Sequence, residues 1–321
     1  MRNICVCLEF LSEPRCAAIR ETAERLGFSV RFFTPEQRSE ALAFVPECEV
    51  LFAHDAELVR AGAKLNWFHC SWAGVDAYCR DDGLFANPAC VLTNNHSYGV
   101  TISEHVIMVT LMLLRRMTEY QAAMAEKYWQ PPIPIRSIRG GRFTILGTGD
   151  IGRHVARRLR AMDAGQVTGV SRGGRPQPEF DTVVAIPELD AVLPETDVLI
   201  MALPGTADTA GILSRERLFL LPEGACVVNV GRGTAIDQTA LCDALNSGHL
   251  GGAALDVMAP EPLPEAHPLW SARNIILTPH VSGTMNLPYT CDVTVEQFCR
   301  NLERYAAGTP LEGVVDRTAG Y

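Results

Sequence analysis

Three polar residues follow predicted strands in the second half of the chain, and together they could reduce a 2-oxo acid. They are Arg232, Glu261 and His280. Such a reduction needs a group that holds the substrate carboxylate, a positive charge that polarises the carbonyl, and a proton for the forming alkoxide. An arginine supplies the first two. A histidine supplies the proton, because its ordinary pKa lies near neutrality, and a glutamate would orient the imidazole and favour its protonated form.

Each of these residues also has an ordinary structural explanation when it is taken alone. Arg232 could cap a turn, Glu261 could be a surface charge between prolines, and His280 could be a hydrogen-bonded histidine after Pro279. The catalytic interpretation therefore depends on a cofactor-binding element elsewhere in the chain.

Such an element is predicted around Gly147. The apolar run 143–146 ends in Gly147-Thr-Gly-Asp-Ile-Gly152, and a helical pattern follows through Val155, Leu159 and Met162. A G-x-G-x-x-G pattern is informative when a strand precedes it and a helix follows. The first glycine permits the tight turn, the second lets a pyrophosphate approach the backbone, and the third lets the helix pack on the strand. The N–H groups at the helix start would hold the phosphates.

The next predicted strand indicates which dinucleotide is bound. An NAD enzyme usually has Asp or Glu after this strand, for the ribose 2′-hydroxyl. Here the strand 167–170 is followed by Ser171-Arg172, with Arg175 close behind. An arginine can pair with a 2′-phosphate, so we expect NADP(H) to be preferred, with NAD(H) possible. The alternative is a solvated basic turn without a ligand.

Composition favours a two-domain globular protein. The chain has 321 residues, of which 47% are hydrophobic and 20% charged, with a net charge of −9. This charge argues against a nucleic-acid or anionic-membrane partner, although it does not exclude an anionic substrate. The eleven cysteines are scattered without a C-x-x-C pair. We therefore expect reduced thiols, a cytoplasmic location and no metal site. The longest apolar stretch, 106–114, is too short to span a bilayer.

The β/α alternation along the chain predicts an α/β fold. The part up to about Asn95 reads as a small α/β domain without a phosphate fingerprint of its own. Thr101-Ile-Ser-Glu104 reads as a capping box that opens an apolar helix through Met117. Further strands are expected at 182–185, 198–202, 226–230, 252–257 and 274–278, which predicts a doubly wound parallel sheet with its ligand beyond the carboxyl ends of the strands. We expect the tail 308–321 to return to the first domain.

Two other segments are candidates for binding. Trp72-Ala-Gly-Val75 follows a predicted strand, and its backbone N–H groups could hold a carboxylate, although a plain strand-to-helix turn is equally consistent. The loop Tyr128-Trp-Gln-Pro-Pro-Ile-Pro134 could be an interface arm or a rigid linker. We also consider four aromatic residues as possible walls of a substrate pocket: Trp72, Tyr98, Trp129 and Trp270.

These motifs, in this order, resemble those of the D-2-hydroxyacid dehydrogenases over nearly the whole chain. The resemblance rests on Ala73-Gly-Val-Asp76, Gly147 to Gly152, Leu203-Pro-Gly-Thr206, Asn229-Val-Gly-Arg-Gly233, Leu255-Asp-Val257 with Glu261-Pro262, Pro268-Leu-Trp270, and Thr278-Pro-His-Val-Ser-Gly283.

The resemblance implies a fold, a partner and residue roles. It implies two Rossmann-like domains, with a central doubly wound cofactor domain (residues 99–285) inserted in a flavodoxin-like substrate domain (residues 1–98 and 286–321), and a homodimer joined through the cofactor domains. Catalytic roles fall on Arg232, Glu261 and His280, and substrate binding on Trp72, Ala73, Gly74, Val75 and Arg232. Cofactor binding falls on Gly147, Gly149, Asp150, Ile151, Gly152, Ser171, Arg172, Leu203, Pro204, Val230, Gly231, Asp256 and His280.

Within the family, the chain looks most like the glyoxylate/hydroxypyruvate reductase A type, through Ser171-Arg172, Tyr128-Trp-Gln-Pro131 and the ending Val315 to Tyr321. Asp150 departs from many relatives, and its carboxylate would weaken phosphate binding unless it points away. The alternatives are a dehydrogenase for bulkier 2-oxo acids or 3-phosphoglycerate, or a dinucleotide-sensing protein like the C-terminal-binding co-repressors. Formate dehydrogenases usually have Gln in place of Glu261, which argues against them.

Overall fold

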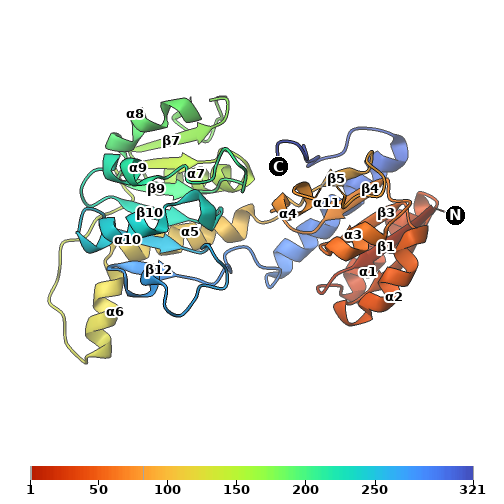
Figure 1. Cartoon of the computed structure of the whole chain (residues 1–321), viewed down its shortest axis with the longest axis horizontal. Coiled ribbons are helices and arrows are strands. Elements are labelled where there is room, and N and C mark those ends of the chain that lie inside the picture. The colour runs from red at the N-terminus through yellow and green to blue at the C-terminus, as the bar shows by residue number, and fades with distance from the viewer. Residues whose placement is uncertain (1, 82, 321) are drawn as a thin grey trace. The chain divides into compact units, whose positions relative to one another are not determined.

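Two compact α/β units make up the chain (Figure 1). The computed structural model describes residues 2–81 and 83–320. The first unit comprises Met1–Tyr98 and Thr284–Tyr321, and the second comprises Gly99–Gly283. Each unit contains one parallel sheet with helices packed against it. The expected fold class, a doubly wound cofactor-type sheet and a flavodoxin-like sheet, is confirmed.

The first unit is built on a five-stranded parallel sheet in the order β2-β1-β3-β4-β5. Side chains alternate across this sheet: Ile4 and Val6 of β1 face one core, and Cys5 and Cys7 face the other. Both faces are buried, which explains the nearly continuous apolar runs of these strands. The strands are β1 (Arg2–Cys7), β2 (Phe28–Phe33), β3 (Val50–Ala53), β4 (Trp67–Cys70) and β5 (Val91–Thr93).

The helices of the first unit come from both ends of the chain. One face of the sheet packs against α1 and α11 through Ile19 and Phe298, and the other packs against α2 and α3 through Ala41 and Leu58. After α11 the chain returns to β5, where the Val315 N–H donates to Leu92 O at 2.9 Å. The helices are α1 (Glu13–Arg25), α2 (Arg38–Phe44), α3 (Ala56–Ala61), α4 (Asp76–Cys79) and α11 (Pro288–Ala307).

The second unit is built on a seven-stranded parallel sheet in the order β12-β11-β10-β9-β6-β7-β8. The chain runs outward from β6 in one direction to β8 and then returns to β9 on the other side. The order therefore reverses between β6 and β9, which is where a doubly wound sheet binds its ligand. The strands are β6 (Arg142–Leu146), β7 (Gln166–Ser171), β8 (Thr182–Ala185), β9 (Val198–Met201), β10 (Cys226–Asn229), β11 (Gly252–Leu255) and β12 (Ile275–Leu277).

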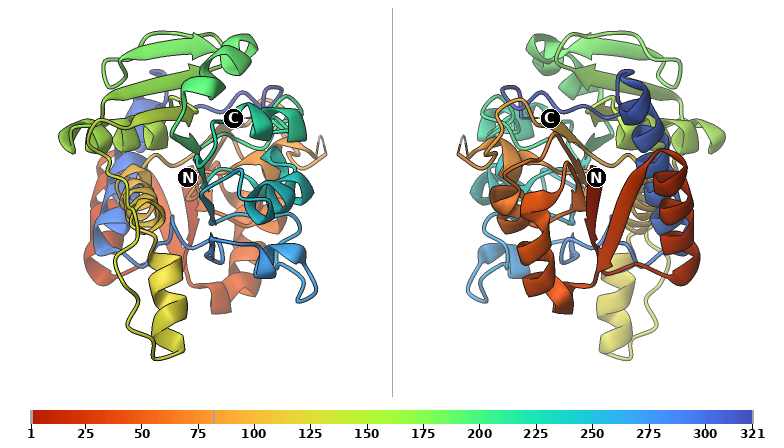
Figure 2. Two further views of the ribbon diagram at one scale, coloured as in Figure 1. Left: turned by 90° about the vertical axis from the view of Figure 1, so that its left-hand side faces the viewer. Right: turned by 90° about the vertical axis from the view of Figure 1, so that its right-hand side faces the viewer.

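Helices of the second unit cover both faces of this sheet. α5 packs against α7 and the strands β10 and β11, while α8, α9 and α10 share a core with the other face through Leu189, Leu218 and Leu241. α6 and the loop after it protrude from the unit as an arm, drawn in yellow in Figures 1 and 2. The helices are α5 (Gly99–Leu114), α6 (Met117–Ala125), α7 (Asp150–Ala161), α8 (Leu189–Val192), α9 (Arg215–Leu220) and α10 (Gln238–Asn246).

Two details of the expected helix 101–117 are wrong. α5 begins at Gly99, so Thr101 lies inside the helix, and the Ser103 hydroxyl donates to Val100 O at 2.9 Å. The predicted capping box is therefore not the cap. The helix also ends at Leu114, because Arg116 adopts a left-handed conformation (φ 57°) that starts α6 in a new direction.

Candidate active site

The glycine turn after β6 has the geometry that a bound pyrophosphate requires. Gly147 has a φ of +102°, and a Cβ there would lie 2.6 Å from Ala202 O. A Cβ on Gly152 would lie 1.9 Å from Gly147 O, so only glycine lets α7 approach the turn so closely. Gly149 is the N-cap of α7, makes no side-chain cap and faces open space. The first N–H groups of α7, including that of Ile151, are thus placed to bind an anion.

Asp150 turns its carboxylate back along its own helix. Its Oδ1 lies 3.7 Å from His154 Nε2 one turn later, and a Cβ built on Gly99 would approach Asp150 Oδ2 to 2.6 Å. Burial, with the nearby arginines of α7, lowers the pKa of His154, although Asp150 opposes this. The carboxylate therefore lies against the start of α5, which reduces its conflict with a phosphate at Gly149.

The turn after β7 is basic and held by its first residue. The Gly174 N–H donates to the Ser171 hydroxyl at 3.1 Å, and Gly174 itself has a φ of +62°. Arg172 and Arg175 are exposed on this turn. The carboxylate that an NAD enzyme usually places here is absent from 171–175 of the sequence.

The loops after β9 and β10 approach each other at Gly231. A Cβ there would lie 2.7 Å from Leu203 O, so glycine is required for this contact. Leu203 and Val230 are each 7% exposed, and Pro204 follows Leu203 in the same loop. These residues thus form one edge of the sheet at its carboxyl end, beside the glycine turn that approaches Ala202.

Arg232 is positioned by a buried asparagine to which no role was assigned from the sequence. Asn229 is fully buried at the end of β10; its Nδ2 donates to Arg232 O at 2.9 Å, and its Oδ1 accepts from Gly231 N at 3.0 Å. The Arg232 side chain also donates from Nη1 to Gly231 O at 2.8 Å. Gly233 packs on the backbone of Met258, because a Cβ there would lie 2.0 Å from Met258 C.

Glu261 and His280 form a hydrogen-bonded pair. His280 Nδ1 lies 2.8 Å from Glu261 Oε2, and Glu261 Oε1 accepts from the Met258 N–H at 2.9 Å. The backbone contact fixes the carboxylate, and the carboxylate orients the imidazole so that Nε2 points away from it. About half of the His280 side chain is exposed. His280 also has a φ of +55°, which is uncommon for a residue other than glycine and is typical of functional sites.

Asp256 holds the segment that carries His280. Its side chain is 1% exposed; Oδ1 accepts from the Thr278 hydroxyl at 2.6 Å and the Val281 N–H at 2.9 Å, and Oδ2 accepts from the Ser282 N–H at 2.9 Å. The His280 N–H donates to Asp256 O at 2.8 Å. Burial works to raise the pKa of Asp256, but the hydrogen bonds from Ser282, Thr278 and Val281 outweigh it and lower the pKa. The carboxylate therefore stays ionised and anchors the loop.

The Trp72–Val75 loop belongs to the first unit and is held by two asparagines. Asn95 Nδ2 donates to Ser71 O at 2.9 Å, the Asn95 N–H donates to Trp72 O at 3.1 Å, and Asn94 Nδ2 donates to Ala73 O at 2.8 Å. The carbonyl oxygens of Trp72 and Ala73 are thus engaged by the two residues that follow β5. Asn94 and Asn95 directly follow β5, a strand that was not among those predicted from the sequence, so no signal pointed to these two residues.

The four aromatic residues are divided between the two units and differ in exposure. Tyr98 is 4% exposed and its hydroxyl donates to Ser71 O at 3.2 Å, so it is part of the interior of the first unit. Trp72 is 46% exposed. Trp129 is 94% exposed on the arm of the second unit, and Trp270 is 56% exposed with its Nε1 donating to Pro264 O at 2.9 Å. Tyr98 is therefore a core residue of the first unit.

All eleven cysteines are free, and nine of them are buried. Across residues 2–81 and 83–320, side chains of His, Cys, Asp and Glu form no group of three or more that could hold a metal ion. In the same described part of the chain, no helix is both long enough and apolar enough to cross a membrane.

Comparison with known proteins identifies the family. The model of the D-isomer specific 2-hydroxyacid dehydrogenase NAD binding domain matches residues 107–282. A glyoxylate/hydroxypyruvate reductase A from Salmonella newport is 33% identical over 286 residues, which cover 88% of this chain and 87% of the relative.

Two solved structures are similar over the full length of both chains. A D-isomer specific 2-hydroxyacid dehydrogenase from Xanthobacter autotrophicus, in complex with NADPH and MES, is 27% identical with a TM-score of 0.84 and 100% coverage of each chain. An NADPH-dependent glyoxylate/hydroxypyruvate reductase from Sinorhizobium meliloti, in complex with NADP and sulfate, is 26% identical with a TM-score of 0.82 and the same coverage. The chain thus belongs to the D-isomer specific 2-hydroxyacid dehydrogenase family and is an NAD(P)-dependent oxidoreductase that acts on a CH–OH group.

Proposed function

We propose that this protein is an NADP(H)-preferring reductase of small 2-oxo acids, with glyoxylate or hydroxypyruvate as its substrate. The observation that carries the proposal is the 2.8 Å contact between His280 Nδ1 and Glu261, in the same unit as Arg232 and the glycine turn. The printed functions of the Salmonella newport and Sinorhizobium meliloti relatives support this substrate class.

The second unit fits a dinucleotide. Gly149 leaves open space at the start of α7, and close backbone contacts at Gly147 and Gly152 keep that space accessible. We assign the pyrophosphate to the N–H groups of Asp150, Ile151 and Gly152. Leu203, Pro204, Val230 and Gly231 would line the continuation of the site, and the nicotinamide would supply the hydride.

In the proposed reaction the protein residues bind, polarise and protonate. Arg232 holds the substrate carboxylate with its guanidinium and polarises the C2 carbonyl. As C2 receives the hydride, His280 donates the Nε2 proton to the carbonyl oxygen, which becomes the 2-hydroxyl group. Glu261 stabilises the protonated imidazole before the transfer. Asp256 fixes the segment that carries His280 through its hydrogen bonds to Thr278, Val281 and Ser282. The family resemblance implies that Asp256 lies near the nicotinamide.

The NADP(H) preference is assigned to the turn after β7. The Arg172 guanidinium would pair with the 2′-phosphate, and the Ser171 hydroxyl would add a hydrogen bond. A carboxylate at this position would repel that phosphate. Complexes of the Xanthobacter autotrophicus and Sinorhizobium meliloti proteins with NADPH or NADP support the assignment.

We assign substrate-carboxylate binding in the first unit to the N–H groups of Ala73, Gly74 and Val75, next to Trp72. The hydrogen bonds described for this loop engage its carbonyl oxygens, which fixes the loop without consuming these N–H groups. The first unit thus serves as the substrate domain and the second as the cofactor domain.

We also propose a homodimer formed through the second unit. Its arm exposes apolar side chains, with Met124 73%, Tyr128 58% and Trp129 94% exposed. A monomer rarely leaves such a group uncovered. Light scattering of the wild type should give the mass of two chains, and Trp129→Asp should shift it toward one. Trp270→Asp, a change of another exposed tryptophan of the same unit, serves as the control.

The proposed reaction is tested by loss of nicotinamide absorbance, with NADPH and NADH compared on glyoxylate, hydroxypyruvate, pyruvate and phenylpyruvate. We expect fast NADPH oxidation with the first two acids. Glu261→Gln should lower kcat about 100-fold, the usual scale for general acid catalysis, whereas Glu265→Gln, at an exposed carboxylate four residues later, should not. Activity confined to phenylpyruvate would refute the substrate class. Cofactor binding without any turnover would refute the enzyme assignment and favour a sensor.

A further inference from the structure

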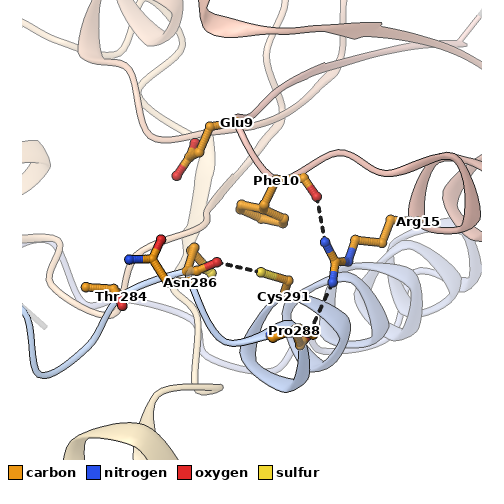
Figure 3. Close-up of a pocket in the computed structure, with 8 residues that line it drawn as sticks. Glu9, Phe10, Arg15, Thr284, Asn286, Pro288 and Cys291 are labelled. Atoms are coloured by element: carbon orange, nitrogen blue, oxygen red, sulfur yellow. Dashed lines mark hydrogen bonds between the residues drawn. The ribbon is translucent and has the colours of Figure 1, made fainter.

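A pocket of about 510 Å³ lies in the first unit, and the proposed reaction leaves it unused (Figure 3). The residues after β1 form one side, and the segment that leads into α11 forms the other. Its lining includes Glu9, Phe10, Arg15, Thr284, Asn286 and Cys291.

The pocket is lined by one carboxylate, that of Glu9, and one guanidinium, that of Arg15. Arg15 is its one cationic lining residue, and its guanidinium is already used by Asp292 Oδ1 at 2.8 Å, Phe10 O at 2.9 Å and Pro288 O at 3.3 Å. Figure 3 shows the two backbone contacts. The Cys291 thiol is also engaged, by Met285 O at 3.0 Å. The Glu9 carboxylate remains the charged group that a ligand in this pocket would meet, since its side chain is 45% exposed.

Glu9 is connected to the loop that we assign to the substrate carboxylate. Glu9 Oε2 lies 3.7 Å from His54 Nε2, and His54 Nδ1 lies 2.9 Å from the Ser71 hydroxyl. The His54 ring also stacks on Trp72, with centroids 4.4 Å apart. These residues follow β1, β3 and β4, so they share the carboxyl edge of the sheet. In the strand order 2-1-3-4-5, the reversal between β1 and β3 is where ligands bind.

From this arrangement we infer that Glu9 selects the side chain of the 2-oxo acid. The inference rests on the proposed function and narrows its substrate class. The Glu9 carboxylate accepts a hydrogen bond from a hydroxyl or ammonium group beyond C2, and the polar side chains of Thr284 and Asn286 line the same pocket. An acid whose side chain ends in a phosphate or a carboxylate is repelled, because the pocket offers no cation that is free to pair with it. The Trp72 ring, which stacks on His54, connects Glu9 to the Trp72–Val75 loop.

The test compares three substrates that differ only beyond C2: glyoxylate, hydroxypyruvate and 3-phosphohydroxypyruvate. The wild type should prefer hydroxypyruvate to its phosphate by at least about 100-fold in kcat/KM. Glu9→Gln should reduce this preference at least about tenfold, as expected when one like charge is removed at short range. Glu9→Ala should also lower the hydroxypyruvate-to-glyoxylate ratio several-fold. Glu24→Gln, at an exposed carboxylate of α1, is the control and should change neither ratio.

The outcomes separate this inference from the proposed function. Glyoxylate has no side chain beyond C2 for Glu9 to contact, so Glu9→Gln should reduce it at the rate of the wild type. This activity also shows that the variant is folded. An unchanged preference in Glu9→Gln with glyoxylate turnover intact would overturn the role of Glu9 alone. Equal loss with all three acids would also overturn it, because Glu9 would then serve the reaction generally. No glyoxylate turnover by the wild type would overturn the proposed function, and this inference with it.

Discussion

Asp256→Asn should loosen the segment that carries His280. Asp256 is 1% exposed and accepts hydrogen bonds from Thr278, Val281 and Ser282 at 2.6 to 2.9 Å. An asparagine side chain has the same shape, but an NH2 group, which donates hydrogen bonds, replaces one of the two accepting oxygen atoms. With the amide nitrogen in the place of Oδ2, the Ser282 N–H faces a donor; in the place of Oδ1, the Val281 N–H does so.

The expected cost of this change follows from that geometry. In either orientation at least one buried N–H loses a charged acceptor, and such a loss costs about 2–3 kcal/mol. The free energy of unfolding of the second unit should therefore fall by that amount, and the unit should unfold at a lower urea concentration. Because His280 N–H is bound to Asp256 O in the same turn, kcat should also fall, and NADPH affinity should change much less.

The effect on stability should depend on pH. The pKa of Asp256 is lowered in the folded state, so its contribution is present above the unfolded pKa and is lost as pH falls through the folded value. The stability difference between wild type and variant should thus be largest at neutral pH and shrink in acid.

Urea unfolding and amide exchange at Val281 and Ser282 measure this effect. Asp208→Asn, at an exposed carboxylate of the same unit, is the control. A loss of less than about 0.5 kcal/mol, the scale of an ordinary surface substitution, with unchanged exchange at both amides, would refute the anchoring role.

Three further predictions concern the cofactor and the core. Arg172→Ala should shift the NADPH/NADH ratio of kcat/KM toward NADH at least about tenfold, since a charge-assisted contact to the 2′-phosphate is lost; an unchanged ratio would show that the 2′-phosphate binds elsewhere. Gly152→Val should weaken NADPH binding at least about tenfold by fluorescence titration, because the Cβ position lies 1.9 Å from Gly147 O. His69 is fully buried, and burial lowers its pKa from 6.5 to about 3. The free energy of unfolding of the wild type should therefore fall as pH drops below 6.5, by up to about 1.4 kcal/mol per pH unit. His69→Gln should remove this part of the pH dependence, and the same pH dependence of stability in wild type and variant would contradict the role of His69.

The buried environment of His69 explains why that residue stays neutral. Trp67 Nε1 donates to the Thr93 hydroxyl at 2.8 Å, so the hydroxyl proton is available for His69 Nδ1 at 2.7 Å. The remaining Nε2–H then points among aromatic rings, including Phe52 with centroids 5.0 Å apart, and has no hydrogen-bond partner. A second proton would add a charge with no counterion in this core.

The sequence by itself determined the features that depend on short-range spacing. Gly147, Gly149 and Gly152 predict the turn and the start of α7, because backbone sterics within six residues decide that geometry. The apolar runs predict both sheets, because a parallel strand buried on both faces has little choice of side chain. Arg232 and His280 were singled out as candidates on a related ground, since each comes three residues after a strand of a sheet of the type that binds ligands at that edge.

Only the tertiary structure decided how distant groups combine. Glu261 and His280 are 19 residues apart and meet because β11 and β12 are neighbours. The anchoring of the His280 segment by Asp256 and the burial of Tyr98 likewise depend on contacts between segments that are distant in the sequence. The Glu9–His54–Trp72 group joins the ends of three strands. Local periodicity contains no information about such contacts, because they are set by strand order and by the cost of leaving a buried polar group unpaired.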